Sequence, residues 1–104
     1  MKKIIAGMIL TGLLISGNAF AQNTKSCKFL ANMAEKVMSA RQDNVPMLKL
    51  VENFQNSELP EHIIEGIVYL ISMAYSTPRY STERNKRNAA IDFQNRIFNG
   101  CIND

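Results

Sequence analysis

The sequence predicts an all-α protein, a small bundle of about four helices that is closed by one disulfide between its N- and C-terminal ends. After the first 21 residues, apolar side chains recur at steps of three and four residues, which is the spacing of one face of an α-helix. Pro46, Pro60 and Pro78 interrupt this pattern and divide it into four helical segments. The two cysteines, Cys27 and Cys101, stand near the two ends of the helical region.

The first 21 residues have the features of a cleavable secretory signal peptide. Lys2 and Lys3 precede the apolar run 4–15, and the segment ends on Ala-Phe-Ala at residues 19–21. The apolar run is too short to cross a hydrocarbon layer of roughly 30 Å comfortably. We therefore expect a periplasmic or secreted protein in which residues 22–104 form a single helical domain without a membrane span.

Cys27 and Cys101 are expected to form a disulfide bond, because an exported chain enters an oxidising compartment. The bond closes a loop of about 73 residues, and by restricting the unfolded chain it stabilises the fold by roughly 4 kcal/mol. The alternative is a redox-active or nucleophilic thiol. Neither cysteine has a CxxC partner or a histidine nearby in the sequence, so a structural bond is favoured.

The first helix is predicted from about Ser26 to Gln42. Its apolar face consists of Cys27, Leu30, Ala31, Ala34, Val37 and Met38. Asp43 and Asn44 then favour a turn, and Pro46 suits the first position of a short second helix, where its missing N–H would have no partner. The apolar stripe of this second helix consists of Met47, Leu50, Val51 and Phe54.

The third helix is predicted to begin after Pro60 and to end near Ser76, because Thr77 precedes Pro78 and so disfavours helical geometry. Its apolar positions are Ile63, Ile64, Ile67, Val68, Leu70, Ile71, Ala74 and Tyr75. With so broad an apolar surface, we expect this helix to be the central and most enclosed one. Gly66 in the middle of this helix lowers helix stability by about 1 kcal/mol relative to alanine. A glycine at this position is therefore taken to allow the close approach of a neighbouring helix; the alternative is the close approach of an oligomer partner.

The fourth helix is predicted from about Thr82 to Asn99, with Ser81 as its N-cap and Gly100 as its C-cap. Its apolar stripe consists of Ala90, Phe93, Ile97 and Cys101. A disulfide from Cys27 to the end of this helix makes the first and fourth helices antiparallel neighbours. Since the connections are short, a compact up-and-down bundle is the simplest topology.

The segment YSTPRYSTERNKR, residues 75–87, is the candidate binding surface. Glu83 precedes Arg87 by four residues, which favours an ion pair. Arg84, Lys86 and Arg87 fall in the first two turns of the fourth helix, where cations oppose the helix dipole. Either aliphatic stems cover the end of the bundle, or the helix offers these cations to a partner. The candidate partner-binding residues are Tyr75, Arg79, Tyr80, Arg84, Lys86 and Arg87.

The sequence contains no arrangement of residues that is typical of an active site. The only histidine, His62, has Glu58 and Glu65 near it, but no second ligand pair that would complete a metal site. GxSxG, HExxH and glycine-rich phosphate-loop motifs are absent. Residues 22–104 carry ten basic and nine acidic side chains, a balance that does not favour nucleic acid. We therefore expect neither metal, cofactor nor enzymatic activity; two carboxylates that the fold brings together are the alternative.

Four features together carry a resemblance: the secretory signal and the stretches CKFLANMAEKVMSARQDNVPM, AYSTPRYSTE and DFQNRIFNGC. On them the chain resembles an uncharacterised family of short exported helical proteins of bacteria and bacteriophages, a resemblance that implies export but no particular activity. On CKFLA and the overall design, the chain is also similar to the HdeA-type periplasmic acid-stress chaperones, although its cysteines are farther apart.

These observations predict a non-enzymatic exported small binding protein, a modulator or inhibitor of an envelope or periplasmic protein. Its partner would be an unidentified protein of the cell envelope. The similarity to HdeA-type proteins implies the alternative, an acid-activated periplasmic chaperone.

Overall fold

The computed structural model describes residues 24–103, which fold into four helices without a strand. The helices are α2 (Thr24–Gln42), α3 (Met47–Gln55), α4 (Glu61–Tyr75) and α5 (Glu83–Ile102). The predicted all-α class is confirmed. The signal peptide predicted for residues 1–21 lies outside the described residues. In the part of the chain that is described, no helix has the length and apolar character needed to cross a membrane.

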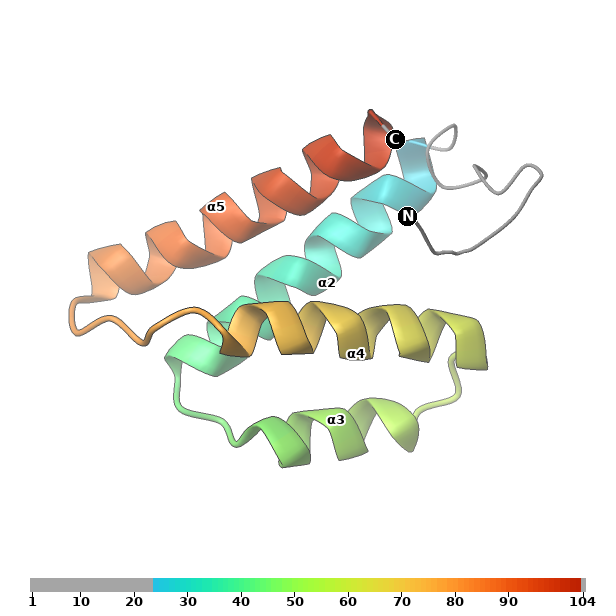
Figure 1. Ribbon diagram of the computed structural model, residues 1–104, viewed down its shortest axis with the longest axis horizontal. Coiled ribbons are helices and arrows are strands. Elements are labelled where there is room, and N and C mark those ends of the chain that lie inside the picture. Colours follow the sequence, from blue (N-terminus) through green and yellow to red (C-terminus); the bar gives the residue numbers. More distant parts are fainter. Residues whose placement is uncertain (1–23, 104) are drawn as a thin grey trace.

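α2 packs against two of the other helices, and the fourth lies outside this group (Figure 1). α5 runs antiparallel beside α2 along most of its length, α4 packs on α2 as well, and α3 packs on α4. The prediction that α4 is the most enclosed helix is wrong, because α2 has six buried side chains and α4 has four. Three of those on α2 are small, Cys27, Ala31 and Ala34, and they recur at the spacing of one helix face. Small side chains let α5 come close, so α2 is enclosed by two neighbours.

The hydrophobic core lies where α2, α4 and α5 meet. Its largest fully buried apolar side chains are Met38 from α2, Ile67 and Ile71 from α4, and Phe93 from α5. Within α3 no side chain is fully buried, and its apolar stripe only flanks the core. The core is therefore built by the three long helices, with α3 as an outer cover on α4.

The predicted disulfide between Cys27 and Cys101 is confirmed, with the two Cα atoms 5.6 Å apart. It joins the first turn of α2 to the last turn of α5 and so fixes the antiparallel pair at one end (Figure 1). Cys27 is fully buried. The bond lies at the opposite end of these two helices from the connection between α4 and α5.

The C-terminal end of α2 adopts the turn that Asp43 and Asn44 predict. Asn44 has φ 67°, in the left-handed region that asparagine tolerates. The N–H of Asn44 donates to the carbonyl of Arg41, and the N–H of Val45 donates to the carbonyl of Ala40, which is a Schellman motif. These backbone bonds leave the carbonyl oxygen of Gln42 free for another donor.

Two helix starts differ by one residue from the sequence prediction. Pro46 is the N-cap of α3 instead of its first helical residue. The N-cap of α5 is Thr82 and not Ser81, because the hydroxyl oxygen of Thr82 accepts a hydrogen bond of 3.1 Å from the N–H of Asn85. Serine and threonine are both good N-caps, so the choice between neighbours depends on the path of the chain.

Neither glycine of the described helices has the role that the sequence predicted. Gly100 does not cap α5, which continues through it to Ile102. The disulfide of Cys101 holds this last turn on α2, and the side-chain amide of Asn103 closes the helix by donating to the carbonyl of Asn99 at 2.9 Å. At Gly66, a Cβ atom would meet nothing within 4 Å. The predicted close approach of a neighbouring helix is thus wrong, and an oligomer partner at Gly66 stays a prediction.

Candidate partner-binding site

Residues 75–87, which we call the corner, comprise the end of α4, the connection 76–82 and the start of α5. They contain all six candidate binding residues predicted from the sequence. The C-terminal end of α2 lies against the corner and hydrogen-bonds to it at several points. These bonds separate the candidate residues into those engaged inside the molecule and those left exposed.

Gln42 holds the middle of the corner with its side-chain amide. It is only 1% exposed, and its Nε2 donates to the carbonyl of Pro78 at 2.9 Å while its Oε1 accepts from the N–H of Tyr80 at 2.8 Å. The amide thus bridges an acceptor and a donor that are two residues apart, as a peptide group of a neighbouring strand does. Nε2 also lies 3.7 Å from the sulfur of Met38. The buried amide is therefore satisfied, as buried polar groups generally are.

Arg41 and Tyr75 hold the start of the corner. The Nε of Arg41 donates to the carbonyl of Thr77 at 3.0 Å, and its guanidinium lies 5.2 Å from the centre of the Tyr75 ring. This is a cation–π contact. The hydroxyl of Tyr75 donates to the carbonyl of Val45, in the connection between α2 and α3. Tyr75 is thus engaged on its ring and on its hydroxyl, and it joins the end of α4 to the end of α2.

Lys86, one of the cations at the start of α5, has a partner inside the fold. Its Nζ donates to the carbonyl oxygen of Gln42 at 3.2 Å, the carbonyl that the Schellman motif leaves free. Because α5 runs antiparallel to α2, the positive start of α5 lies beside the negative end of the α2 dipole (Figure 1). The unfavourable position of Lys86 in its own helix is offset by this interaction with its neighbour.

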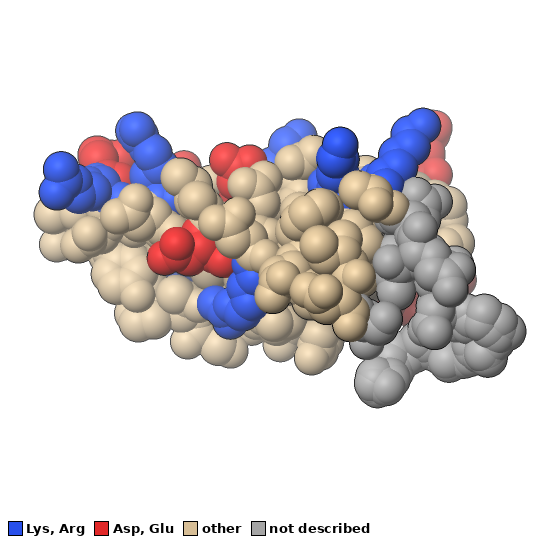
Figure 2. All heavy atoms as spheres, turned by 90° about the horizontal axis from the view of Figure 1, so that it is seen from above, with Lys and Arg blue, Asp and Glu red and all other residues tan. Residues whose placement is uncertain are grey.

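Three arginines of the corner, Arg79, Arg84 and Arg87, are exposed. Within residues 24–103, none of their guanidinium groups makes a hydrogen bond or an ion pair, and the expected pair between Glu83 and Arg87 does not form. Tyr80 is 39% exposed although its backbone N–H is held by Gln42. Figure 2 shows basic side chains, with acidic ones near them, at the end of the molecule where α5 begins.

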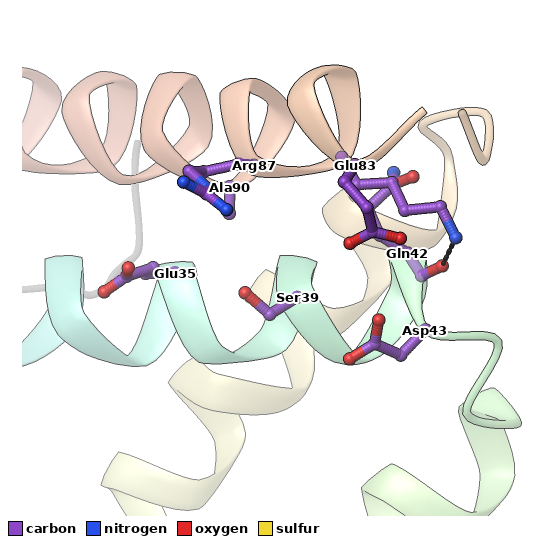
Figure 3. A pocket seen from close by; sticks show the side chains of 8 residues that line it. Glu35, Ser39, Gln42, Asp43, Glu83, Arg87 and Ala90 are labelled. Carbon is purple, nitrogen blue, oxygen red and sulfur yellow. Dashed lines mark hydrogen bonds between the residues drawn. The ribbon is translucent and has the colours of Figure 1, made fainter. Parts of the chain in front are cut away.

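A polar groove of about 310 Å³ runs between α2 and the start of α5, so part of its lining belongs to the corner (Figure 3). Its charged lining consists of Glu35, Asp43, Glu83, Lys86 and Arg87. The side chains of α5 reach toward α2, where the dashed hydrogen bond of Figure 3 joins Lys86 to the carbonyl of Gln42. Pockets for small molecules are mostly apolar, so this groove does not resemble one. In the described residues, no three of the side chains that bind metals are grouped to hold an ion.

Comparison with known proteins finds no match. This holds for protein-family models, for curated proteins and for solved structures. The two resemblances inferred from the sequence therefore stay predictions.

Sequence reasoning missed Arg41 and Gln42, which determine the shape of the corner. Gln42 lies four residues after Met38 and eight after Ala34, in line with the buried face of α2. A glutamine that continues an apolar stripe is a signal that its amide has a buried partner, because an unpaired amide there would be costly. His62 lies in the first turn of α4, about 20 Å along that helix from the corner at a rise of 1.5 Å per residue.

Tyr75 is expected to make the fold sensitive to alkali. Burial raises the pKa of Tyr75 above its ordinary value of 10.0, and the charge of Arg41 lowers it by a smaller amount. Since the folded pKa exceeds the unfolded one, the resulting stabilisation is fully present below the unfolded pKa and is lost as the pH rises through the folded pKa. The phenolate also has no proton to donate to Val45.

The test compares wild type, Tyr75→Phe and Tyr69→Phe, a control that changes an exposed tyrosine of the same helix. The free energy of unfolding in urea is measured between about pH 8 and pH 11. At neutral pH we expect Tyr75→Phe to lose about 1 kcal/mol for the missing hydrogen bond. Above about pH 10 the wild type and Tyr69→Phe should lose stability faster than Tyr75→Phe. Parallel curves for all three proteins would contradict the assignment.

Proposed function

We propose that this protein is a non-enzymatic exported binding module that docks onto a protein of the cell envelope through its corner and modulates or inhibits that protein. The observation that supports the proposal is that the backbone of the corner is held in place while several of its side chains are exposed. Its backbone is held by Arg41 and Gln42, whereas the side chains of Arg79, Arg84 and Arg87 have no partner inside the described part of the chain.

A backbone that is already fixed favours binding, because little conformational entropy is lost when a partner docks. The hydrogen bonds of Gln42 to Pro78 and Tyr80 supply that order. Arginine and tyrosine are also the residue types, together with tryptophan, that most often anchor protein interfaces. The exposed guanidinium groups break no hydrogen bond or ion pair of the described residues when they contact a partner. The free energy of their interaction with the partner is therefore not reduced by the loss of an internal bond.

The proposed location rests on the disulfide and on the sequence. A bond between Cys27 and Cys101 forms and persists in oxidising compartments such as the bacterial periplasm. The first 21 residues have the pattern of a secretory signal. Both features support an envelope protein as the partner.

The proposal is tested by crosslinking and affinity capture of the oxidised protein in envelope extracts. The wild type is compared with the double variant Arg84→Ala plus Arg87→Ala and with the control Lys28→Ala plus Lys36→Ala, which removes two exposed cations from α2. We expect one reproducible partner that the arginine variant loses and the lysine variant keeps, while the melting temperatures of all three agree. Loss of the partner in neither variant would place binding elsewhere, and no reproducible partner would contradict the proposed function.

A further inference from the structure

We infer that the corner recognises an extended acidic segment of a protein partner, one whose carboxylates stand at alternate positions. This inference rests on the proposed function and deepens it by naming the chemistry of the partner. Three arginines, Arg79, Arg84 and Arg87, are exposed within one short stretch of sequence that also contains the exposed Tyr80, and none of them has a partner within residues 24–103. No other segment of residues 24–103 brings three arginines so close in sequence.

The residue type favours carboxylates. A guanidinium group is planar and presents parallel N–H donors that match the two oxygens of a carboxylate. Within the described part of the chain, no carboxylate takes up these donors at Arg84 or Arg87, even though Glu83 neighbours both along the helix. The donors are therefore available to carboxylates that come from outside.

The spacing favours an extended segment. Arg84 and Arg87 are three residues apart on α5, so their Cβ atoms lie about 5 to 6 Å apart on neighbouring turns. In an extended peptide, side chains that point to the same side are two residues apart, which is about 6.6 Å. Two acidic residues separated by one residue therefore match the arginine pair. Arg79, on the connection before the helix, can take a further carboxylate of the same segment.

Tyr80 gives the surface an apolar anchor in addition to charge. Tyr80 is 39% exposed and its backbone N–H is fixed on Gln42, so its side chain stays at the surface of the same segment as Arg79. A tyrosine ring offers a large contact area for a peptide backbone and for aliphatic stems. An extended acidic segment would lie across this ring with its carboxylates directed at the guanidinium groups.

The acidic side chains near the arginines argue against a lipid surface. Glu35, Asp43 and Glu83 line the same groove as Arg87 and carry negative charge close to it. A membrane with anionic headgroups presents negative charge everywhere, so it would repel these carboxylates as it attracted the arginines. A peptide segment places its charges only where arginines stand. The local mixture of charges thus favours a protein partner.

The test uses fluorescence anisotropy with defined peptides and the oxidised protein. The probe is a labelled peptide of about ten residues in which glutamate and serine alternate. One control peptide has the same composition with its glutamates in a single block, and a second replaces every glutamate by glutamine. Vesicles that contain anionic phosphatidylglycerol are a separate arm. The proteins are the wild type, Arg84→Ala plus Arg87→Ala, and the matched Lys28→Ala plus Lys36→Ala.

We expect the alternating peptide to bind the wild type at least about threefold more tightly than the block peptide, and the glutamine peptide not to bind measurably. The arginine variant should lose about tenfold in affinity for the alternating peptide, whereas the lysine variant should change by less than about twofold. Binding should weaken as salt is raised.

Four results would overturn the inference: equal binding of the block peptide, equal binding of the glutamine peptide, equal losses in the two variants, or binding to anionic vesicles without binding to the peptide. The capture experiment is independent of these readouts. If a partner is captured through Arg84 and Arg87 but the acidic peptide does not bind, the inference fails and the proposed function stands. If the peptide binds but envelope extracts yield no partner, the proposed function fails instead.

Discussion

Replacing Cys27 and Cys101 by alanine is expected to lower the free energy of unfolding by about 4 kcal/mol, a large part of the stability of so small a domain. The bond closes a loop with a sequence separation of 74, which restricts the unfolded chain. In the folded state it also holds an end of the α2–α5 pair that contributes no fully buried residue to the main core cluster, since that cluster begins on α2 at Ala34. Without the bond, this end relies on small side chains and partly buried neighbours.

The measurement is urea unfolding of the oxidised wild type and the double variant, followed by the circular dichroism of the helices. Hydrogen exchange shows which part of the fold loses stability. Amides in the first turns of α2 and the last turns of α5 should lose more protection than those near Phe93. Reduction of the wild type serves as the control, since it breaks the bond without changing the sequence. A loss below about 1 kcal/mol in both would show that packing alone holds the two ends together.

Gln42→Met is expected to lower the free energy of unfolding by about 2 to 3 kcal/mol and to release the corner. Methionine has a similar volume, so packing around the site is largely kept. The variant leaves the carbonyl of Pro78 and the N–H of Tyr80 without their partner, and both lie against a side chain that is 1% exposed. Unpaired groups in such a place carry a desolvation cost that exposed groups do not.

Two measurements separate the loss of the amide from a general loss of stability. The first is hydrogen exchange at Tyr80, which should become much faster in Gln42→Met than global unfolding explains. The second is unfolding of the control Gln55→Met, which changes an exposed glutamine of α3 and should shift stability by less than about 0.5 kcal/mol. Unchanged protection at Tyr80 would mean that the corner keeps its shape without Gln42.

The helices could be predicted because their signals are local. Apolar spacing places each helix, and Thr77 before Pro78 ends α4 within one residue of its observed end at Tyr75. The disulfide could be predicted because the chain offers only one pairing. Which helices are neighbours could not be predicted. The width of the apolar face of α4 predicts that this helix is buried, but it does not show which helix lies beside it. The arrangement follows from the small side chains of α2, whose effect appears only when α5 lies against them.

The corner is a candidate site on its sequence alone, but the hydrogen bonds that hold it could not be predicted from the sequence. The sequence shows that Lys86 opposes the dipole of its own helix, yet the carbonyl of Gln42 that resolves this conflict is 44 residues away along the chain. The same holds for Arg41 and Gln42, whose bonds to the corner span 36 residues or more. The spacing of apolar residues indicates which side chains share a face of one helix, but it does not predict contacts between residues far apart in the sequence. The pair expected between Glu83 and Arg87, a local interaction, does not form and leaves Arg87 exposed.

The buried amide of Gln42 makes the shape of the corner independent of the side chains that the corner displays. The backbone there is held from beneath by α2, so positions 79, 80, 84 and 87 can be substituted without disturbing any hydrogen bond by which α2 holds it. A library varied at these four positions would explore new partners on an unchanged frame. In this sense Arg41 and Gln42 fix the backbone of the corner, and the exposed residues determine what binds.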